Sequence, residues 1–117
     1  NLIKMILLGD KEELDRLYAH LTSLYPDVSI IHNTDHYIEV YSALVNKGKA
    51  IDFLLETIQV KSGNTLCIGD SYIDIPMFDH CAYKAAVANA VQPLLEKANI
   101  ITPSNNQMGV KHLLDLL

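Results

Sequence analysis

The second half of the sequence alternates short apolar runs with helical patterns, and this alternation restricts the possible folds more than any other feature. The runs have the length of strands, and they are "TLCIG" (65–69), "KAAVAN" (84–89) and "NIIT" (99–102). Strands that alternate with helices predict parallel βαβ units, in which helices cover both faces of the sheet. The sequence therefore predicts an α/β fold.

The first part of the chain has a different pattern. A strand predicted at 2–8 is followed by a helical pattern in which Asp10 and Glu13 have the spacing of a capping box. Two further strand patterns follow at 28–33 and 36–42, joined by a short polar link. We therefore expect two parts, residues 1–42 and residues 43–117.

Length and charge limit the classes of protein to which the chain can belong. It has 117 residues, about one domain, and half of them are hydrophobic. The formal net charge of -5 argues against a nucleic-acid binder, which normally has a basic face. No apolar run approaches the roughly 20 residues that span a membrane. Cys67 and Cys81 lack the spacing of a disulfide framework, so we expect reduced thiols and a cytoplasmic protein.

Two aspartates follow the apolar strand that ends at Gly69. Asp70 comes directly after it, and Asp74 lies about one helical turn further on. Ligands of open α/β sheets bind beyond the carboxyl ends of the strands, so we expect both carboxylates at that crevice. Two close carboxylates repel each other, and a Mg²⁺ ion, which prefers oxygen ligands, would relieve the repulsion. The alternative is that Asp70 and Ser71 only cap the next helix and that Asp74 is solvated.

Four segments resemble, in order and spacing, the end of the haloacid dehalogenase superfamily, and most closely its Cof-type sugar-phosphate phosphatases. They are "NKGKAIDFLLE", "TLCIGDSYIDIPMF", "AAVANA" and "IITPSNNQMGVKHLLDLL". This match covers 46–117, and residues 1–45 resemble more loosely the last part of the family's α/β cap. The resemblance implies the C-terminal half of a three-layer, Rossmann-like core, together with a partial cap.

The resemblance also implies a Mg²⁺-dependent phosphatase that acts on a small phosphorylated metabolite. Asp70 would bind Mg²⁺, Asp74 would support the metal and the catalysis, and Lys47 would contact the transferred phosphoryl group. A lysine at the start of a helix is unfavourable with the helix dipole, which favours a functional role for Lys47. Ser71 and Asn89 are further candidates to bind the phosphate, and the alternative for Asn89 is a cap on the helix that follows it.

Two features depart from the family pattern. Ile73 stands where the family usually has an asparagine that helps to hold the phosphate, and isoleucine cannot donate a hydrogen bond. The family's nucleophile belongs to an Asp-x-Asp segment, and none occurs in the 117 residues. We therefore expect the chain to be the C-terminal part of a longer protein and to be inactive alone. The alternative function is a non-catalytic α/β module that binds a partner or a phosphate ligand.

The absent nucleophile segment has a structural consequence. In the complete family core, the strand that ends at Gly69 pairs with the strand that bears the nucleophile. Without that neighbour, the strand presents an open apolar edge, which invites pairing or aggregation. We expect a second copy of the chain, in a homo-oligomer, or a missing N-terminal segment to cover this edge.

Overall fold

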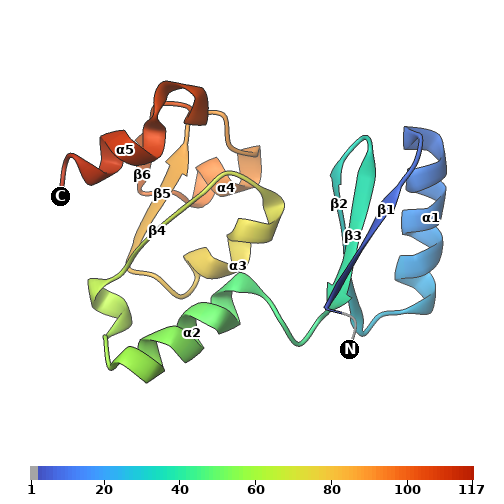
Figure 1. Cartoon of the computed structure of the whole chain (residues 1–117), viewed down its shortest axis with the longest axis horizontal. Helices are drawn as coiled ribbons and strands as arrows, with labels where there is room; N and C mark the ends of the chain where they lie inside the picture. The colour runs from blue at the N-terminus through green and yellow to red at the C-terminus, as the bar shows by residue number, and fades with distance from the viewer. Residues whose placement is uncertain (1–2) are drawn as a thin grey trace. The chain divides into compact units, whose positions relative to one another are not determined.

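The computed structural model describes residues 3–117 and divides the chain into two compact units, Asn1–Val45 and Asn46–Leu117 (Figure 1). The division expected between residues 42 and 43 lies in the turn that leads out of the first unit. Leu2, which belongs to the first predicted strand, lies outside the described residues.

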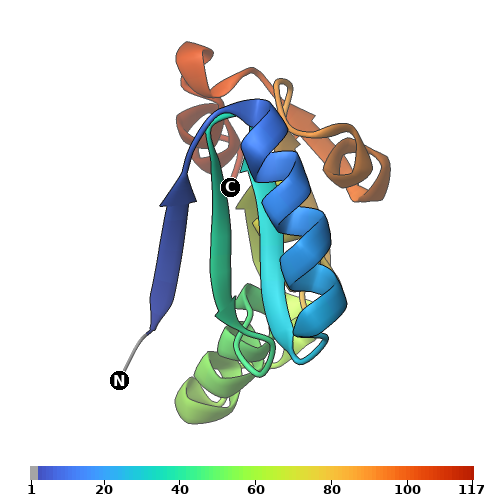
Figure 2. The ribbon, with the colours of Figure 1, turned by 90° about the vertical axis from the view of Figure 1, so that its right-hand side faces the viewer.

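The first unit is a three-stranded antiparallel sheet with one helix against it. The sheet has the order β1-β3-β2, and its strands are β1 (Lys4–Leu8), β2 (Val28–Thr34) and β3 (Tyr37–Ser42). The helix α1 (Lys11–Leu24) lies along β2 and β3, as Figure 2 shows. Leu14 of the helix and Ile38 of β3 are almost completely buried and form the core of this unit.

The predicted capping box at the start of α1 is wrong. Asp10 is the residue before the helix, as expected, but its side chain makes no capping hydrogen bond. The acidic side chains of Glu12 and Glu13 lie in the first turn, where they interact favourably with the helix dipole. The helix therefore begins where the sequence predicts, without the reciprocal side-chain bonds.

The second unit is a parallel sheet with helices on both faces, as the sequence predicts. The strands β4 (Leu66–Gly69), β5 (Tyr83–Val87) and β6 (Ile100–Thr102) lie in the order β4-β5-β6, and both pairs are parallel. Their carboxyl ends therefore lie along one edge of the sheet. Figure 1 shows α3 (Ile75–Phe78) and α4 (Gln92–Lys97) on one side and α5 (Gly109–Leu114) on the other. The remaining helix, α2 (Lys47–Ile58), lies against α3.

The core of the second unit lies mainly between the sheet and the two helices α3 and α4. Its buried members are Cys67 and Ala86 from the sheet, together with Met77, Phe78, Cys81 and Leu94. On the other face, Val87 of β5 and Leu113 of α5 are buried. Both thiols are free and buried.

One edge of this sheet is unpaired, and one helix presents apolar side chains to solvent. Among the strands that the structure describes, β4 pairs only with β5, so it forms the predicted sheet edge. Three large apolar side chains of α2 are also more than half exposed, namely Phe53, Leu54 and Ile58. Surface of this kind is typical of an interface rather than of an isolated unit. Within residues 3–117, no helix is long and apolar enough to cross a membrane.

Candidate active site

The loop after β4 folds back on the end of the strand, and a glycine makes this possible. A Cβ atom at Gly69 would lie 2.6 Å from the Cβ atom of Asp74, a distance that real side chains do not adopt. The chain then forms a short 3-10 turn, Tyr72–Asp74, and enters α3 with Pro76 in its first turn, as predicted. The Asp74 side chain therefore returns to the strand end and retains only 5% of its exposure.

The Asp74 carboxylate organises the loop. Its Oδ2 atom accepts hydrogen bonds from the backbone N–H of Asp70 (2.9 Å) and of Ser71 (3.0 Å), and from the Ser71 hydroxyl (3.3 Å). Its Oδ1 atom accepts from the Nζ atom of Lys47. Three donors and one ammonium group thus surround a single buried carboxylate. Of the predicted alternative, the part in which Asp74 is merely solvated is wrong, whereas the cap by Ser71 is confirmed, because Ser71 precedes the 3-10 turn and forms a capping box with Asp74.

The two carboxyl groups have opposite pKa shifts. Burial by itself raises the pKa of Asp74, but the Lys47 ammonium and the two backbone N–H groups outweigh it, so the pKa lies below its usual value. Partial desolvation, together with the neighbouring Asp74, raises the pKa of Asp70, and Lys47 offsets only part of this rise. The pair therefore holds one firmly ionised carboxylate and one that ionises less readily.

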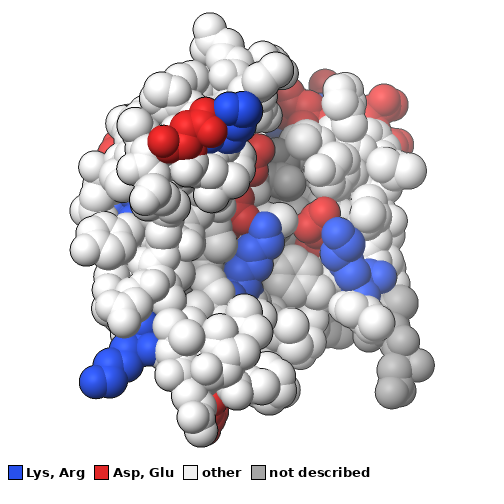
Figure 3. All heavy atoms as spheres, turned by 60° about the vertical axis from the view of Figure 1, so that its left-hand side comes forward, with Lys and Arg blue, Asp and Glu red and all other residues white. Residues whose placement is uncertain are grey.

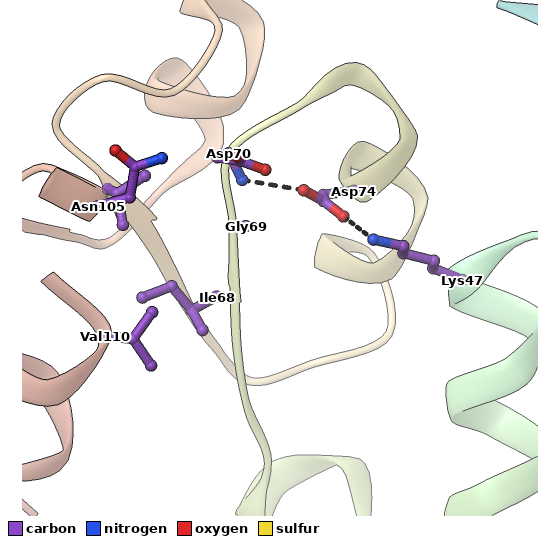
Figure 4. A pocket seen from close by; sticks show the side chains of 8 residues that line it. Lys47, Ile68, Gly69, Asp70, Asp74, Asn105 and Val110 are labelled. Carbon is purple, nitrogen blue, oxygen red and sulfur yellow. Dashed lines mark hydrogen bonds and ion pairs between the residues drawn. The ribbon is translucent and has the colours of Figure 1, made fainter. Parts of the chain in front are cut away.

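Lys47 reaches the loop from the first residue of α2. The helix start is fixed by Asn46, whose side-chain oxygen accepts a hydrogen bond from the backbone N–H of Lys49 at 2.9 Å. The Lys47 side chain is 50% exposed, and its Nζ atom contacts the Asp74 carboxylate (Figure 4). The contact with Asp74 offsets the unfavourable position of a cation at a helix N-terminus.

Lys47, Asp70 and Asp74 share one cavity at the carboxyl ends of the strands. The cavity has a volume of about 300 Å³, and it is lined by Lys47, Ile68, Gly69, Asp70, Asp74, Val87, Asn105 and Val110 (Figure 4). On the face that Figure 3 shows, acidic and basic side chains occur in small groups on a largely uncharged surface. The cavity thus contains the Lys47 ammonium group and the carboxylates of Asp70 and Asp74, and apolar side chains from β4, β5 and α5 lie beside them.

The other predicted phosphate ligands do not line this cavity. The Ser71 hydroxyl donates to Asp74, and Ile73 lies half-buried in the 3-10 turn. Asn89 is exposed, and its Oδ1 atom accepts a hydrogen bond from the backbone N–H of Asn105 at 3.0 Å. The alternative of a helix cap for Asn89 is wrong, because Val91 precedes α4 and no side chain caps that helix.

The cavity also contains residues to which the sequence alone assigned no role. Asn105 follows β6, and a polar residue after the third parallel strand was the available signal. Val87 and Val110 gave no signal, because an apolar residue that lines a cavity has the same pattern as one that lies in the core.

The carboxylate groups of the cavity supply only part of the ligands that a divalent cation needs. Within residues 3–117, no cluster of three or more His, Cys, Asp or Glu side chains could by itself hold a metal ion. Asp70 is exposed to the cavity, whereas the oxygens of Asp74 already accept from Lys47 and from the loop. A Mg²⁺ site needs one or two carboxylates, because water and substrate phosphate supply its other ligands. Asp70 fits such a site, and Asp74 would act on it through the loop.

Comparison with known proteins identifies the family. The family model for haloacid dehalogenase-like hydrolases matches residues 1–114. The chain belongs to this family. The resemblance found in the sequence is therefore confirmed, and with it the three-layer α/β fold.

Individual relatives agree with this assignment. The chain is 34% identical over 82 residues to 5-amino-6-(5-phospho-D-ribitylamino)uracil phosphatase YwtE of Bacillus subtilis, and the aligned region covers 70% of this chain and 29% of the relative. It is 41% identical over 78 residues to phosphoglycolate phosphatase of Archaeoglobus fulgidus, and the aligned region covers 67% of this chain and 35% of the relative. The crystal structure of TM0651 from Thermotoga maritima is 31% identical, with a TM-score of 0.80, over 97% of this chain and 43% of that one. The chain thus spans less than half the length of the family members it matches.

Proposed function

We propose that this chain is the C-terminal part of a Mg²⁺-dependent phosphatase that hydrolyses a small phosphorylated metabolite. The observation that carries the proposal is the convergence of Lys47, Asp70 and Asp74 in one cavity at the carboxyl ends of β4 and β5. Membership of a hydrolase family supports it, as do relatives named as phosphatases of phosphorylated small molecules.

Lys47 binds the phosphoryl group in this proposal. Negative charge on the phosphoryl oxygens must be stabilised during the transfer, and a positioned ammonium group does this best where water is scarce. Asp74 holds the Lys47 Nζ atom at the cavity before the substrate arrives, so little reorganisation is needed. Asp74 therefore contributes to catalysis through Lys47 and through the loop amides.

Asp70 is the residue of this chain that would hold Mg²⁺. When bound, the ion would neutralise charge on the phosphoryl oxygens and orient them. A cation beside Asp70 would also relieve the repulsion that raises the pKa of this carboxyl group. Ser71 supports the site by its hydrogen bond to Asp74, and Asn89 by its bond to the backbone of Asn105, which lines the cavity.

The nucleophile of the reaction is proposed to come from a segment that precedes this chain. The family resemblance implies an Asp-x-Asp segment on the strand beside β4, and in this chain β4 is the edge of the described sheet. That segment would cover the open edge and the exposed apolar side chains of α2. A second copy of the chain is the other candidate for this surface. Residues 1–45 would then be part of the cap, and the buried free thiols suit the cytoplasm.

The test uses the complete protein, meaning this chain together with any segment that precedes it. Phosphate release is measured on a panel of phosphorylated sugars and acids with MgCl₂ in excess over the protein, because Mg²⁺ takes its remaining ligands from water and substrate phosphate. Asp70→Asn should reduce kcat/KM by at least about a hundredfold, because one transition-state contact is worth that much. Asp79→Asn is the matched control, since Asp79 is an exposed carboxylate paired with Lys97 away from the cavity. Unchanged turnover in Asp70→Asn would remove Asp70 from the metal site.

A second function has specific support. Ile73 stands where the family resemblance implies an asparagine that helps to hold the phosphate, and isoleucine cannot donate a hydrogen bond. This departure favours a non-catalytic module that binds a phosphate ligand or a partner. The two functions differ in one measurement, because the module would bind inorganic phosphate without hydrolysing any ester in the complete protein.

A further inference from the structure

The position of Lys47 depends on the placement of α2 as well as on the ion pair of its side chain with Asp74. Its side chain is half exposed, so solvent competes for the ammonium group. In α2, all of which the structure describes, only Gly48 is buried, and Phe53 and Leu54 on its surface are more than half exposed. The helix is therefore held to the rest of the unit by a narrow face, on which Gly48 is buried and Ile51 packs against the core while remaining partly exposed.

That contact is a close approach to α3 at Gly48. A Cβ atom added to Gly48 would lie 2.6 Å from the carbonyl oxygen of Pro76 and 2.5 Å from Cδ2 of His80. The carbonyl belongs to backbone only two residues beyond Asp74, so α2 touches the very segment that carries the buried carboxylate. The absence of a side chain at Gly48 thus lets the backbone of Lys47, the preceding residue, lie close to the segment that carries Asp74.

His80 closes this contact from the other side. Its ring lies over Gly48, and its Nδ1 atom is 2.7 Å from Oδ1 of Asp52, one turn further along α2. A carboxylate only accepts hydrogen bonds, so Nδ1 is the donor in this pair. The backbone N–H of His80 donates to the carbonyl of Met77 at 3.1 Å, which ties the residue to the end of α3. His80 therefore links α3 to α2 across the glycine.

We propose that His80 is a positioning residue, and that its bond to Asp52 over Gly48 holds α2 so that Lys47 meets Asp74 at the cavity. The inference rests on the proposed function only for its effect on catalysis, because the placement of Lys47 is a geometric property of this unit. The Asp52–His80 pair itself is partly exposed, so it acts by fixing geometry and contributes little to stability.

The first experiment is a cycle of variants in the complete protein, with inorganic phosphate and MgCl₂ as the probe. Binding of phosphate is measured by calorimetry for the unmodified protein, His80→Ala, Lys47→Met and the double variant. Loss of one well-placed hydrogen bond between charged groups lowers an equilibrium constant by about tenfold or more, so we expect His80→Ala to weaken phosphate binding by about tenfold. In the Lys47→Met background, His80→Ala should have no further effect, because it acts through Lys47. Equal weakening in both backgrounds would show a merely structural role and overturn the proposal.

Variants of the partner carboxylate sharpen the test. Asp52→Ala should behave like His80→Ala, whereas Asp52→Asn should retain most of the binding, because its amide oxygen can still accept from Nδ1. Asp79→Asn is the matched control, since the side chains of Asp52 and Asp79 are 59% and 60% exposed and Asp79 pairs with Lys97 instead of His80. Equal loss in Asp52→Asn and Asp52→Ala would contradict the hydrogen-bonded link.

A crystal structure of the His80→Ala variant separates this inference from the proposed function. The distance from Lys47 Nζ to the Asp74 carboxylate should exceed about 4 Å, the usual limit of an ion pair. An unchanged contact would overturn the inference even if the protein proves to be a phosphatase. A lost contact in a protein that hydrolyses no phosphate ester would uphold the inference and remove the proposed function.

Discussion

Asp70→Asn and Asp74→Asn make the same chemical change four residues apart, and we expect them to alter the free energy of unfolding in opposite directions. At Asp74 the Oδ2 atom accepts three hydrogen bonds and the Oδ1 atom faces the Lys47 ammonium. Asparagine has one acceptor oxygen, so either the loop donors or Lys47 must face an NH₂ group. Lys47 is half exposed and can turn to water, which leaves the oxygen to the loop.

The magnitude at Asp74 follows from those bonds. Hydrogen bonds to a charged acceptor contribute about 1.5–3 kcal/mol and neutral ones about 1 kcal/mol, so Asp74→Asn should destabilise by roughly 1–2 kcal/mol. The lowered pKa of Asp74 gives the sign of the pH dependence. Its contribution is present above the ordinary carboxyl pKa of about 3.9 and is lost as the pH falls through the lower folded value. The deficit of Asp74→Asn should therefore shrink in acid.

Asp70→Asn should stabilise the protein at neutral pH. Desolvation and the Asp74 charge raise the pKa of Asp70, so its ionised form is disfavoured in the folded state. This penalty is present above the raised folded pKa and disappears as the pH falls below about 3.9, the ordinary value. A neutral amide removes the penalty, and the gain should likewise vanish in acid. Because Asp70 is exposed, the gain should be smaller than the loss at Asp74.

Urea denaturation in EDTA at pH 7 and at pH 3.5 measures both effects. The midpoint should rise for Asp70→Asn and fall for Asp74→Asn, with unchanged slopes. Asp79→Asn, which removes an exposed charge elsewhere, should leave the midpoint nearly unchanged. A midpoint that moves in the same direction for both pocket variants would refute the assignment of opposite environments to the two carboxyl groups.

Two further predictions concern the frame of the second unit. Gly109→Ala should destabilise the protein by about 1–3 kcal/mol, because the new Cβ atom would lie 2.0 Å from the carbonyl oxygen of Pro103. Gly63→Ala is the control, since no atom lies within 4 Å of the new Cβ atom, and it should change the urea midpoint little. Equal shifts of the midpoint in the two variants would contradict the close contact at Gly109. Cys67 should resist iodoacetamide at pH 8 until the protein unfolds, because burial raises the pKa of its thiol to about 12. Mass spectrometry measures the labelling, and rapid labelling of the native protein would contradict the prediction by showing that the thiol is accessible.

The sequence by itself determined the class of fold and the chemistry of the loop after β4. Alternating apolar runs and helical patterns predicted the parallel strands, because a strand buried on both faces and a helix buried on one have different periods. Gly69, Asp70 and Asp74 lie within six residues, so the local chain already brings them together. Resemblance added Lys47, which no local pattern could have connected to Asp74.

Only the tertiary structure decided how the carboxylates divide their roles. Their spacing is compatible with two metal ligands, but burial and three loop donors make Asp74 an organiser of the loop and leave Asp70 open to the cavity. The link from His80 to Asp52 joins residues 28 positions apart. Contacts of this kind depend on how helices pack. A glycine such as Gly48 indicates in the sequence that another part of the chain can approach closely, but not which residue does so.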